Sequence, residues 1–184
     1  MTRLKYIDGM SMKAPLLILV AVATVSISSP LLKEKTVTRG AGCPEGWVDG
    51  YPVNIGCLLF STSARTHWGT ANNFCQFEAG GTLAEVATEI QFDFVRTQLG
   101  LLEVEGSNMW WLSGTDVGVN GVWKWATSYS PVGDFVWTDA SPPIGHRTQN
   151  CLALNHTLDF MASNTHCDTT GAFPICQIKP FWKL

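Results

Sequence analysis

The sequence predicts an α+β domain that is held together by disulfide bonds. Two segments with a helical spacing of apolar residues come first, and short strand-like segments separated by long loops follow them. This order is typical of an α+β fold with antiparallel strand pairing. All six cysteines lie after position 42, behind an N-terminal segment that has the pattern of an export signal. An even cysteine count in a secreted chain indicates three disulfides.

The first expected element is a small hairpin between Cys43 and Phe60. The segment reads "CPEGWVDGYPVNIGCLLF", with proline and glycine turn residues between its two cysteines and an apolar, strand-like run at its end. A disulfide between the two cysteines would close this hairpin.

Two helices are predicted next. From position 66 onwards, Trp68, Ala71 and Cys75 follow at helical spacing, and the glycines of "EAGG" suit the end of a helix. The second helix begins near Thr88, where "TEIQ" matches a capping box: the threonine oxygen accepts a free backbone N–H, and Gln91 can reach back. Its expected apolar face consists of Ile90, Phe94, Val95 and Leu99.

Four further strands are predicted after position 106. The segments "MWWLSGTD" and "VWKWATS" are joined through "VGVNG", whose Asn120–Gly121 step favours a hairpin because both residues tolerate a positive φ. The segments "CLALN" and "AFPICQI" are two more short strands. Turn residues dominate the chain between these pairs, so a long-loop region is expected there.

Five of the eight tryptophans fall in the part of the chain that holds the first two of these strands and the loop after them. They are Trp110, Trp111, Trp123, Trp125 and Trp137. One interpretation is a platform on which sugar rings stack; the other, which we favour, is a set of core side chains. Adjacent residues of a strand point to opposite faces, so one of Trp110 and Trp111 could be exposed.

Residues 1–29 are predicted to be a secretory signal peptide. Arg3, Lys5 and Lys13 precede an apolar run that ends in small residues, which is the order of such a signal. The run is about 15 residues long, which is short for a membrane span. An uncleaved N-terminal anchor is the alternative. With the signal removed, we expect a secreted, extracellular protein that begins with a polar linker over residues 30–42 and does not insert into membranes.

The charge of the chain makes nucleic acid and anionic membranes poor partners. The formal net charge is −3, and lysines and arginines are scattered singly. Both kinds of partner require clustered positive charge.

The six cysteines could instead act as zinc ligands. Three histidines flank Cys151 and Cys167 in the sequence: His146, His156 and His166. No CxxC pair, HxxxH pair or HExxH helix is present, however, and oxidation would compete for the thiols. Spacing alone does not choose among the pairings that six cysteines allow.

The ordered set of these motifs resembles the C-type lectin-like domain family. The motifs are "CPEGW", the helical Trp and Cys followed by "AGGTLAEV", "WLSG" where the family usually has Trp-Ile-Gly-Leu, a W-x-W strand, and a final "ICQ". The resemblance covers about residues 43–179, which leaves 180–184 as a tail. It implies the C-type lectin-like fold: two helices, short antiparallel sheets, a long-loop region and three disulfides.

The resemblance also implies a disulfide pairing. The implied pairs are Cys43–Cys57, Cys75–Cys176 and Cys151–Cys167. The second pair would close a loop of about 100 residues, worth about 4.7 kcal/mol in the chain-entropy model, and the third would contribute about 3 kcal/mol. The second would join the first helix to the last strand, and the third would hold the base of the long loops.

In this family the long loops carry a calcium ion that binds sugar hydroxyls. The family's two ligand-bearing triplets fall here on Ser141-Pro142-Pro143 and Ala162-Ser163-Asn164, and the acid between them on Gln149; the five ligand positions themselves are Ser141, Pro143, Gln149, Ser163 and Asn164. Calcium takes 6–8 oxygen ligands, several of them usually charged, and these positions provide no carboxylate. We therefore expect no metal ligands and no cofactor here, and any calcium that bound would be held weakly.

Two further arrangements bear on calcium. At the auxiliary calcium site of some family members, Asp116 and Asn120 match, but the other positions hold Ile144, Gln149 and Asn150. Asp139 and Asp159 lie nearby in the sequence and would rebuild a weak site if the alignment contained a misplaced gap.

The resemblance implies a secreted recognition protein that binds glycans on cell or microbial surfaces, as in innate immunity. The residues that could bind glycan hydroxyls directly are Ser141, Pro143, His146, Arg147, Gln149 and Asn164. The alternative is a calcium-independent domain that binds a cell-surface or secreted protein. Catalysis is not expected, because no GxSxG, HExxH or glycine-rich phosphate loop is present. Asn155, in "NHT", is a candidate glycosylation site, which would make the product a glycoprotein.

Overall fold

A computed structural model describes residues 42–179 apart from positions 64, 107 and 145–147. The predicted signal peptide, nearly all of the predicted linker and the tail at 180–184 lie outside the described residues. In the described part, no helix is both long and apolar enough to cross a membrane.

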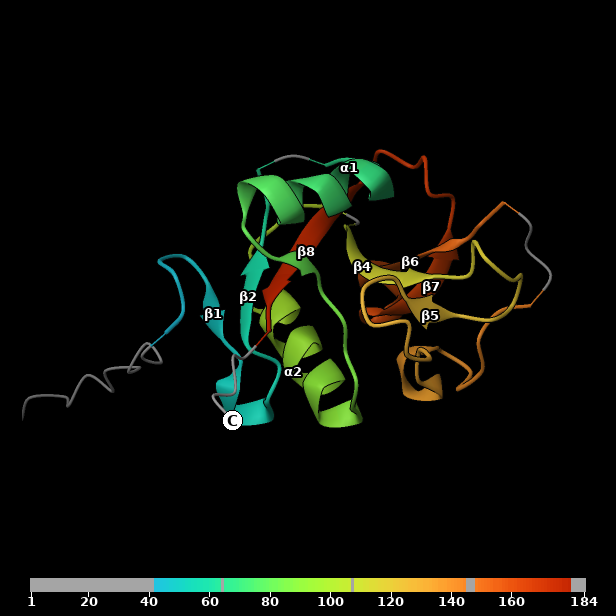
Figure 1. Cartoon of the computed structure of the whole chain (residues 1–184), viewed down its shortest axis with the longest axis horizontal. Helices are drawn as coiled ribbons and strands as arrows, with labels where there is room; N and C mark the ends of the chain where they lie inside the picture. The colour runs from blue at the N-terminus through green and yellow to red at the C-terminus, as the bar shows by residue number, and fades with distance from the viewer. Residues whose placement is uncertain (1–41, 64, 107, 145–147, 180–184) are drawn as a thin grey trace, which may run out of the picture. The chain divides into compact units, whose positions relative to one another are not determined.

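The described chain forms two helices and eight strands (Figure 1). In chain order these are β1 (Val48–Asp49), β2 (Cys57–Phe60), α1 (Trp68–Asn73), β3 (Thr82–Leu83), α2 (Glu89–Gly100), β4 (Met109–Thr115), β5 (Lys124–Trp125), β6 (Cys151–Asn155), β7 (Met161–Thr165) and β8 (Ala172–Ile178). All the predicted elements are present. β1 and β2 form the predicted first hairpin. β3 and β7 were not predicted; β3 has two residues, and β7 ("MASNT") is too polar to show an apolar strand pattern.

The strands join in the order β1-β2-β8-β4-β6-β7, with β3 paired to β8 and β5 paired to β4. Figure 1 shows the C-terminal strand β8 in the middle of this arrangement, between β2 and β4. All the pairs are antiparallel except β4 with β8, which is parallel. The prediction of antiparallel pairing was therefore wrong for this pair. The last strand enters between two strands that already run in opposite directions, so it must be parallel to one of them.

The helix that follows β2 is longer than its α-helical part. His67 caps α1, because its side chain accepts a hydrogen bond from the backbone N–H of Thr70 at 3.2 Å. A π-helical turn, η2 (Phe74–Glu78), continues the helix before the chain turns at Gly80, where φ is +70°. Cys75 lies in this turn and is fully buried, so the π-helical turn carries the disulfide that ties the helix to β8.

The predicted cap of α2 is confirmed, with one change. The Thr88 hydroxyl accepts a hydrogen bond from the N–H of Gln91 at 3.3 Å. The Gln91 side chain reaches back to the N–H of Ala87 at 2.8 Å rather than to that of Thr88. Its amide group also donates to the carbonyl oxygen of Asn54 at 2.8 Å. The glutamine therefore caps the helix and joins it to the first hairpin, which a local sequence pattern does not reveal.

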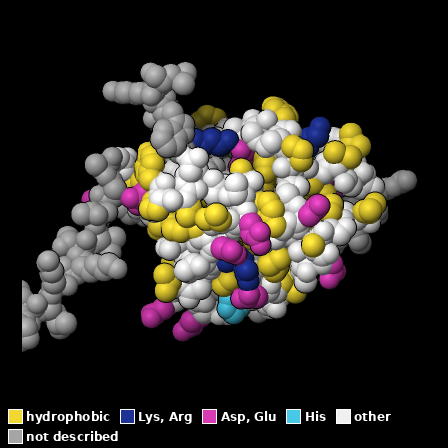
Figure 2. Space-filling model, turned by 90° about the horizontal axis from the view of Figure 1, so that it is seen from below, with side chains coloured by type: hydrophobic (Ala, Val, Ile, Leu, Met, Phe, Trp, Pro, Cys, Tyr) yellow, Lys and Arg dark blue, Asp and Glu magenta, His cyan; other side chains and the backbone are white. Residues whose placement is uncertain are grey.

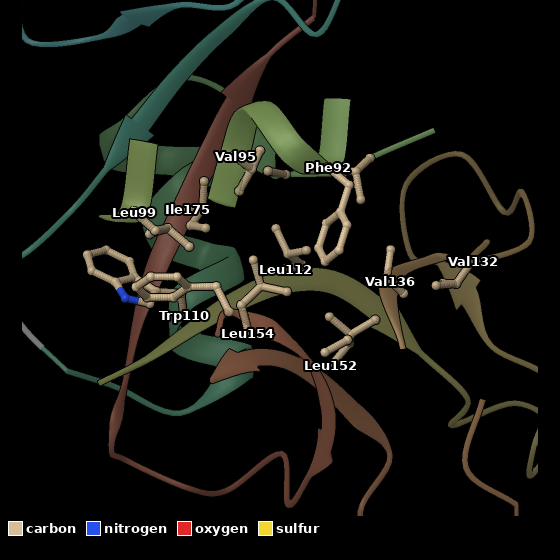
Figure 3. Close-up of a cluster of buried hydrophobic side chains, with 14 of the residues drawn as sticks. Phe92, Val95, Leu99, Trp110, Leu112, Val132, Val136, Leu152, Leu154 and Ile175 are labelled. Carbon is tan, nitrogen blue, oxygen red and sulfur yellow. The ribbon is translucent and has the colours of Figure 1, made fainter. Parts of the chain in front are cut away.

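The predicted apolar face of α2 was partly wrong. The buried apolar residues are Phe92, Val95 and Leu99, whereas Ile90 is 68 % exposed. Figure 3 shows these three side chains packed toward β-strand residues such as Leu112. The spacing of the buried three is i, i+3 and i+7, which is one face of a helix. Ile90 lies in the first turn, on a different face.

All five clustered tryptophans are buried, with exposures of 0–5 %. This confirms the core interpretation and excludes a sugar-stacking platform built from them. Trp110 and Trp111 do point to opposite faces of β4, but neither is exposed, because each face carries its own apolar cluster. Trp110 packs with Phe173 at 5.1 Å between ring centroids, and Trp111 donates from Nε1 to the carbonyl oxygen of Thr66 at 2.8 Å.

The three implied disulfides are all confirmed. The Cα–Cα distances are 5.5 Å for Cys43–Cys57, 5.2 Å for Cys75–Cys176 and 5.1 Å for Cys151–Cys167. The zinc interpretation is wrong, because no thiolate remains to bind the metal once all six cysteines are paired.

The charged side chains of the described residues form few ion pairs. Arg96 on α2 pairs with Asp159 and lies 3.6 Å from Asp93, and Lys179 Nζ lies 2.6 Å from a carboxylate oxygen of Glu85. On the face drawn in Figure 2, acidic side chains are spread widely and basic ones occur at separate points. That face therefore has no continuous basic patch that would suit a polyanion.

Candidate binding site

The loop after Trp137 is held in place by two tryptophans of the core. The rings of Trp123 and Trp137 pack edge to face, with centroids 4.9 Å apart. Trp123 donates from Nε1 to the carbonyl oxygen of Pro143 at 3.3 Å. Trp137 forms an isolated parallel bridge with Ala162 of β7. The backbone of Trp137 and the ring of Trp123 therefore fix the two ends of the segment 137–143.

The turn inside this segment has an uncommon backbone. Ala140 has a φ of +49°, and its N–H donates to the carbonyl oxygen of Trp137 at 3.1 Å. A left-handed backbone is unusual for a residue with a Cβ and persists only where the surroundings determine it. The anchored tryptophan and the two prolines after Ser141 supply such surroundings, so Ser141 is presented on a turn with little freedom.

A shallow cavity of about 210 Å³ lies between this loop and β7. Its lining consists of Trp137, Thr138, Asp139, Ser141, Pro143, Leu158, Ala162, Ser163 and Asn164. Three of the six predicted glycan-binding residues, Ser141, Pro143 and Asn164, therefore line one cavity. Leu158 was not predicted, because it belongs to a short 3-10 turn (His156–Leu158) that has no signal of its own in the sequence.

Gln149 joins the same site through Asn164. The Asn164 side-chain amide donates to Oε1 of Gln149 at 2.9 Å. The pairing of β6 with β7 places Asn164 opposite Leu152, and Gln149 comes two residues before the disulfide-bonded Cys151. The strand register and this disulfide therefore bring together two residues that are 15 positions apart in the chain.

His146 and Arg147 lie outside the described residues, so their place relative to the cavity stays a prediction. Asn155, the predicted glycosylation site, is the last residue of β6. Its side-chain oxygen accepts hydrogen bonds from the N–H and the hydroxyl of Thr157, at 3.0 and 2.8 Å.

A second polar contact lies at the position of the auxiliary calcium site. Asp116 is only 3 % exposed, and both of its carboxylate oxygens are used. Oδ1 accepts a hydrogen bond from the Asn150 side-chain amide, and Oδ2 accepts one from the N–H of Gly121, each at 2.7 Å. The N–H groups therefore satisfy the carboxylate that a cation would otherwise neutralise.

The residues at both positions do not fit a calcium ion. At the first, two neutral amides bond to each other, and at the second, amide donors occupy the one carboxylate. Of the two nearby aspartates, Asp139 lines the cavity, whereas Asp159 pairs with Arg96 of α2. Among the described residues, no cluster of three or more His, Cys, Asp or Glu side chains could hold a metal ion. The alternative that these two aspartates rebuild a site therefore finds no support in the geometry.

The described fold and this site define a binding domain of the C-type lectin type. A family model described as "Lectin C-type domain" matches residues 64–178, and the chain therefore belongs to this family. Domains of this family are generally binding domains without enzymatic activity. No curated protein sequence matches the chain significantly.

Solved structures of the same fold match most of the chain. The chain is 27 % identical to the herring type II antifreeze protein, covering 76 % of this chain and all of that one, with a TM-score of 0.60. It is 22 % identical to a calcium-independent type II antifreeze protein (75 % and 95 % covered, TM-score 0.56). It is 20 % identical to the carbohydrate-recognition domain of the mouse scavenger receptor C-type lectin (75 % and 98 % covered, TM-score 0.56). The last two likenesses concern the fold alone.

Proposed function

We propose that this protein is a secreted recognition domain that binds glycans in the long-loop cavity without calcium. The observation that carries the proposal is the direct hydrogen bond between Gln149 and Asn164. It joins the two loop segments in which the family places calcium ligands, and it does so with neutral amides. The loops are therefore held together by the protein's own side chains.

The chemistry of the cavity suits sugar hydroxyls. Thr138, Ser141 and Ser163 contribute hydroxyl groups, Asp139 contributes a carboxylate, and Asn164 contributes an amide. Hydroxyls and amides both donate and accept hydrogen bonds, which matches the dual character of a sugar hydroxyl.

The cavity also has apolar surface against which the face of a sugar ring can pack. Pro143 and Leu158 are part of its wall. A small number of placed polar groups on an apolar wall is the usual composition of a ligand site. With a volume of about 210 Å³ and an open mouth, the cavity suits one terminal sugar residue rather than an enclosed ligand.

A glycan array tests the proposal. The protein should bind a defined set of glycans equally in calcium and in chelator, because no step of binding uses the ion. Asn164→Ala should weaken this binding about tenfold or more, since it removes one cavity group and the partner of Gln149. The matched control is Asn73→Ala, which removes an exposed asparagine on α1 and should leave binding unchanged.

Two results would contradict the proposal in different ways. Binding that disappears in chelator would show that calcium takes part. No binding under either condition would remove glycans as the ligand. Because the similar structures include antifreeze proteins, ice is then the next ligand to test, by thermal hysteresis. A protein ligand would be recognised by a complex that resists both chelator and free sugars.

The proposed secretion has its own test. Expression in a eukaryotic secretory host should release the protein into the medium. N-terminal sequencing of the released form should begin close to position 30. Retention of residues 1–29 on a membrane-bound product would support the uncleaved anchor instead.

A further inference from the structure

Exposed apolar side chains gather on the two loops around β5. Val117, Val119 and Tyr129 are 69 %, 61 % and 76 % exposed, and Val122 is 47 % exposed. Together with Lys124 they form what we call the β5 surface. It surrounds a cavity of about 300 Å³ whose lining includes Trp125, and none of the residues that line this cavity lines the long-loop cavity. The β5 surface is therefore separate from the proposed glycan site.

The first of its loops, residues 116–122, is held by a buried carboxylate. Asp116 accepts the N–H of Gly121 at 2.7 Å, and the N–H of Val122 donates to the carbonyl oxygen of Val119 at 2.9 Å. The N–H of Val117 donates to the Thr115 hydroxyl at 3.2 Å. These bonds hold the backbone that carries all three valines.

The second loop, residues 126–130, is held by another buried carboxylate. Glu85 is 6 % exposed, and its Oε1 accepts the N–H groups of Thr127 and Ser128 at 3.2 and 2.9 Å. The hydroxyls of Ser128 and Ser130 lie 2.7 Å apart. The carbonyl oxygen of Ser130 accepts the N–H of Trp125 at 2.9 Å, so the backbone is hydrogen-bonded on both sides of Tyr129.

Tyr129 itself combines strain with exposure. Its φ is +59°, a left-handed conformation that is unusual for a large side chain, and its N–H donates to the carbonyl oxygen of Trp125 at 2.9 Å. Most of its ring is in water, so burial of the ring does not offset the strain. Strained residues held by their surroundings occur most often at functional sites. An exposed tyrosine on a fixed backbone loses little conformational entropy when it binds a partner.

The charge of the β5 surface indicates which kind of partner binds it. Lys124 is exposed and lies within salt-bridge distance of no carboxylate of the described residues. The two carboxylates that hold these loops, Asp116 and Glu85, are buried and already bonded. The surface is therefore apolar with one available positive charge, which complements an apolar group beside a carboxylate.

A second copy of the chain and a small amphipathic anion are two other candidate ligands of the β5 surface, and both match it less well than a segment of a partner protein does. A second copy of the chain that paired through the same surface would add a second Lys124 and no exposed carboxylate. A small amphipathic anion would fill the cavity, but it would leave Val117, which is outside the cavity lining, in water. A protein segment covers both the cavity and its apolar surroundings.

We propose that the β5 surface is a docking site for a partner protein, through a segment that presents a large apolar side chain next to an acidic residue. The apolar side chain enters the cavity beside Tyr129, and the carboxylate pairs with Lys124. This proposal does not depend on the glycan site, and either can fail without the other.

Short peptides test the docking site directly. The probes are three acetylated hexapeptides with a central Leu-Glu, Leu-Gln or Leu-Lys pair in a Gly-Ser background, titrated into the ¹⁵N-labelled protein. Amide shifts should concentrate at residues 115–130, with the Glu peptide at least fivefold tighter than the Lys peptide. In Lys124→Glu this order should reverse, because the charge on the surface has been reversed.

Single variants distinguish a loss of peptide binding from a loss of protein stability. Tyr129→Ala should weaken the Glu peptide about tenfold, whereas Tyr51→Ala, at an exposed tyrosine outside the cavity, should leave it unchanged. Thermal melting of each variant checks that the fold is intact. Equal affinity for the three peptides, an order that survives Lys124→Glu, or shifts centred elsewhere would overturn the proposal. Full displacement of the peptide by hexanoate at equal concentration would overturn the proposal in favour of a small-molecule site. Concentration-dependent dimerisation that is lost in Tyr129→Ala would show instead that a second copy of the chain binds this surface.

Discussion

The hydrogen bond between Gln149 and Asn164 predicts how the long loops respond when acidic residues replace these amides. Each single change should be tolerated. In Gln149→Glu, the Asn164 amide still donates to a carboxylate, and in Asn164→Asp, rotation of the Gln149 amide brings its NH₂ group to face the new carboxylate. The double variant has no donor left, and it places two negative charges where the amides now lie 2.9 Å apart.

The size of the effect follows from that distance. Two unit charges at this separation repel by about 1.4 kcal/mol at the dielectric constant of water and by about 6 kcal/mol at an effective value near 20. Both side chains are half-buried, and the carboxylates can move apart, so the lower part of this range applies. Loss of the hydrogen bond adds about 1 kcal/mol. We expect the double variant to lose about 2–4 kcal/mol beyond the sum of the singles.

A double-mutant cycle measured by thermal or denaturant unfolding in chelator provides the assay. For a domain of this size, the extra loss lowers the Tm by about 6–15 °C. Calcium at millimolar concentration should recover part of this loss in the double variant, since a cation can bridge the two carboxylates, and should leave the parent protein unchanged. If the losses of unfolding free energy in the two single variants simply added up to the loss in the double variant in chelator, the hydrogen bond between Gln149 and Asn164 would be refuted. A comparable rise in the Tm of the parent protein on adding calcium would refute the calcium-independent site.

Three further predictions concern the rest of the domain. Glu85→Gln should lower the free energy of unfolding by about 1–3 kcal/mol, because the buried carboxylate accepts two backbone N–H groups and a lysine, and urea unfolding measures this. Replacing Cys75 and Cys176 with alanine should cost about 2–5 kcal/mol, since their bond closes a loop of 101 residues; unchanged stability in calorimetry would contradict this. Asn155→Gln and Thr157→Ala should each remove the mass of one glycan from protein secreted by a eukaryotic host, and identical electrophoretic mobility of all forms would show that the site is not used.

Local signals in the sequence were reliable where one short segment determines the outcome. The Thr88 cap needs only the four residues of its own turn, and the strand β4 begins with four consecutive apolar residues. The burial of Ile90 was predicted wrongly, because helical spacing indicates an apolar face without saying which face the sheet covers. The sequence also left open whether one tryptophan of the adjacent pair is exposed. Alternation predicts two faces, but only the packed structure shows that each face is covered.

For the candidate site too, the sequence predicted some properties and only the structure showed others. The sequence showed that Ser141, Pro143, Gln149 and Asn164 carry no charge, which is enough to argue against a tight calcium site. It did not show that Gln149 and Asn164 bond to each other, because that contact depends on the register between β6 and β7.

By itself, the sequence determined the fold class, the cysteines available for pairing and the absence of carboxylates at the family's calcium-ligand positions. These are properties of composition and of short segments, where each residue acts through its near neighbours. Only the tertiary structure decided which polar groups satisfy one another, and which apolar side chains remain in water around Tyr129. Those outcomes depend on contacts between residues far apart in the chain. Glu85, which lies over 40 positions before the turn that it holds, is an example.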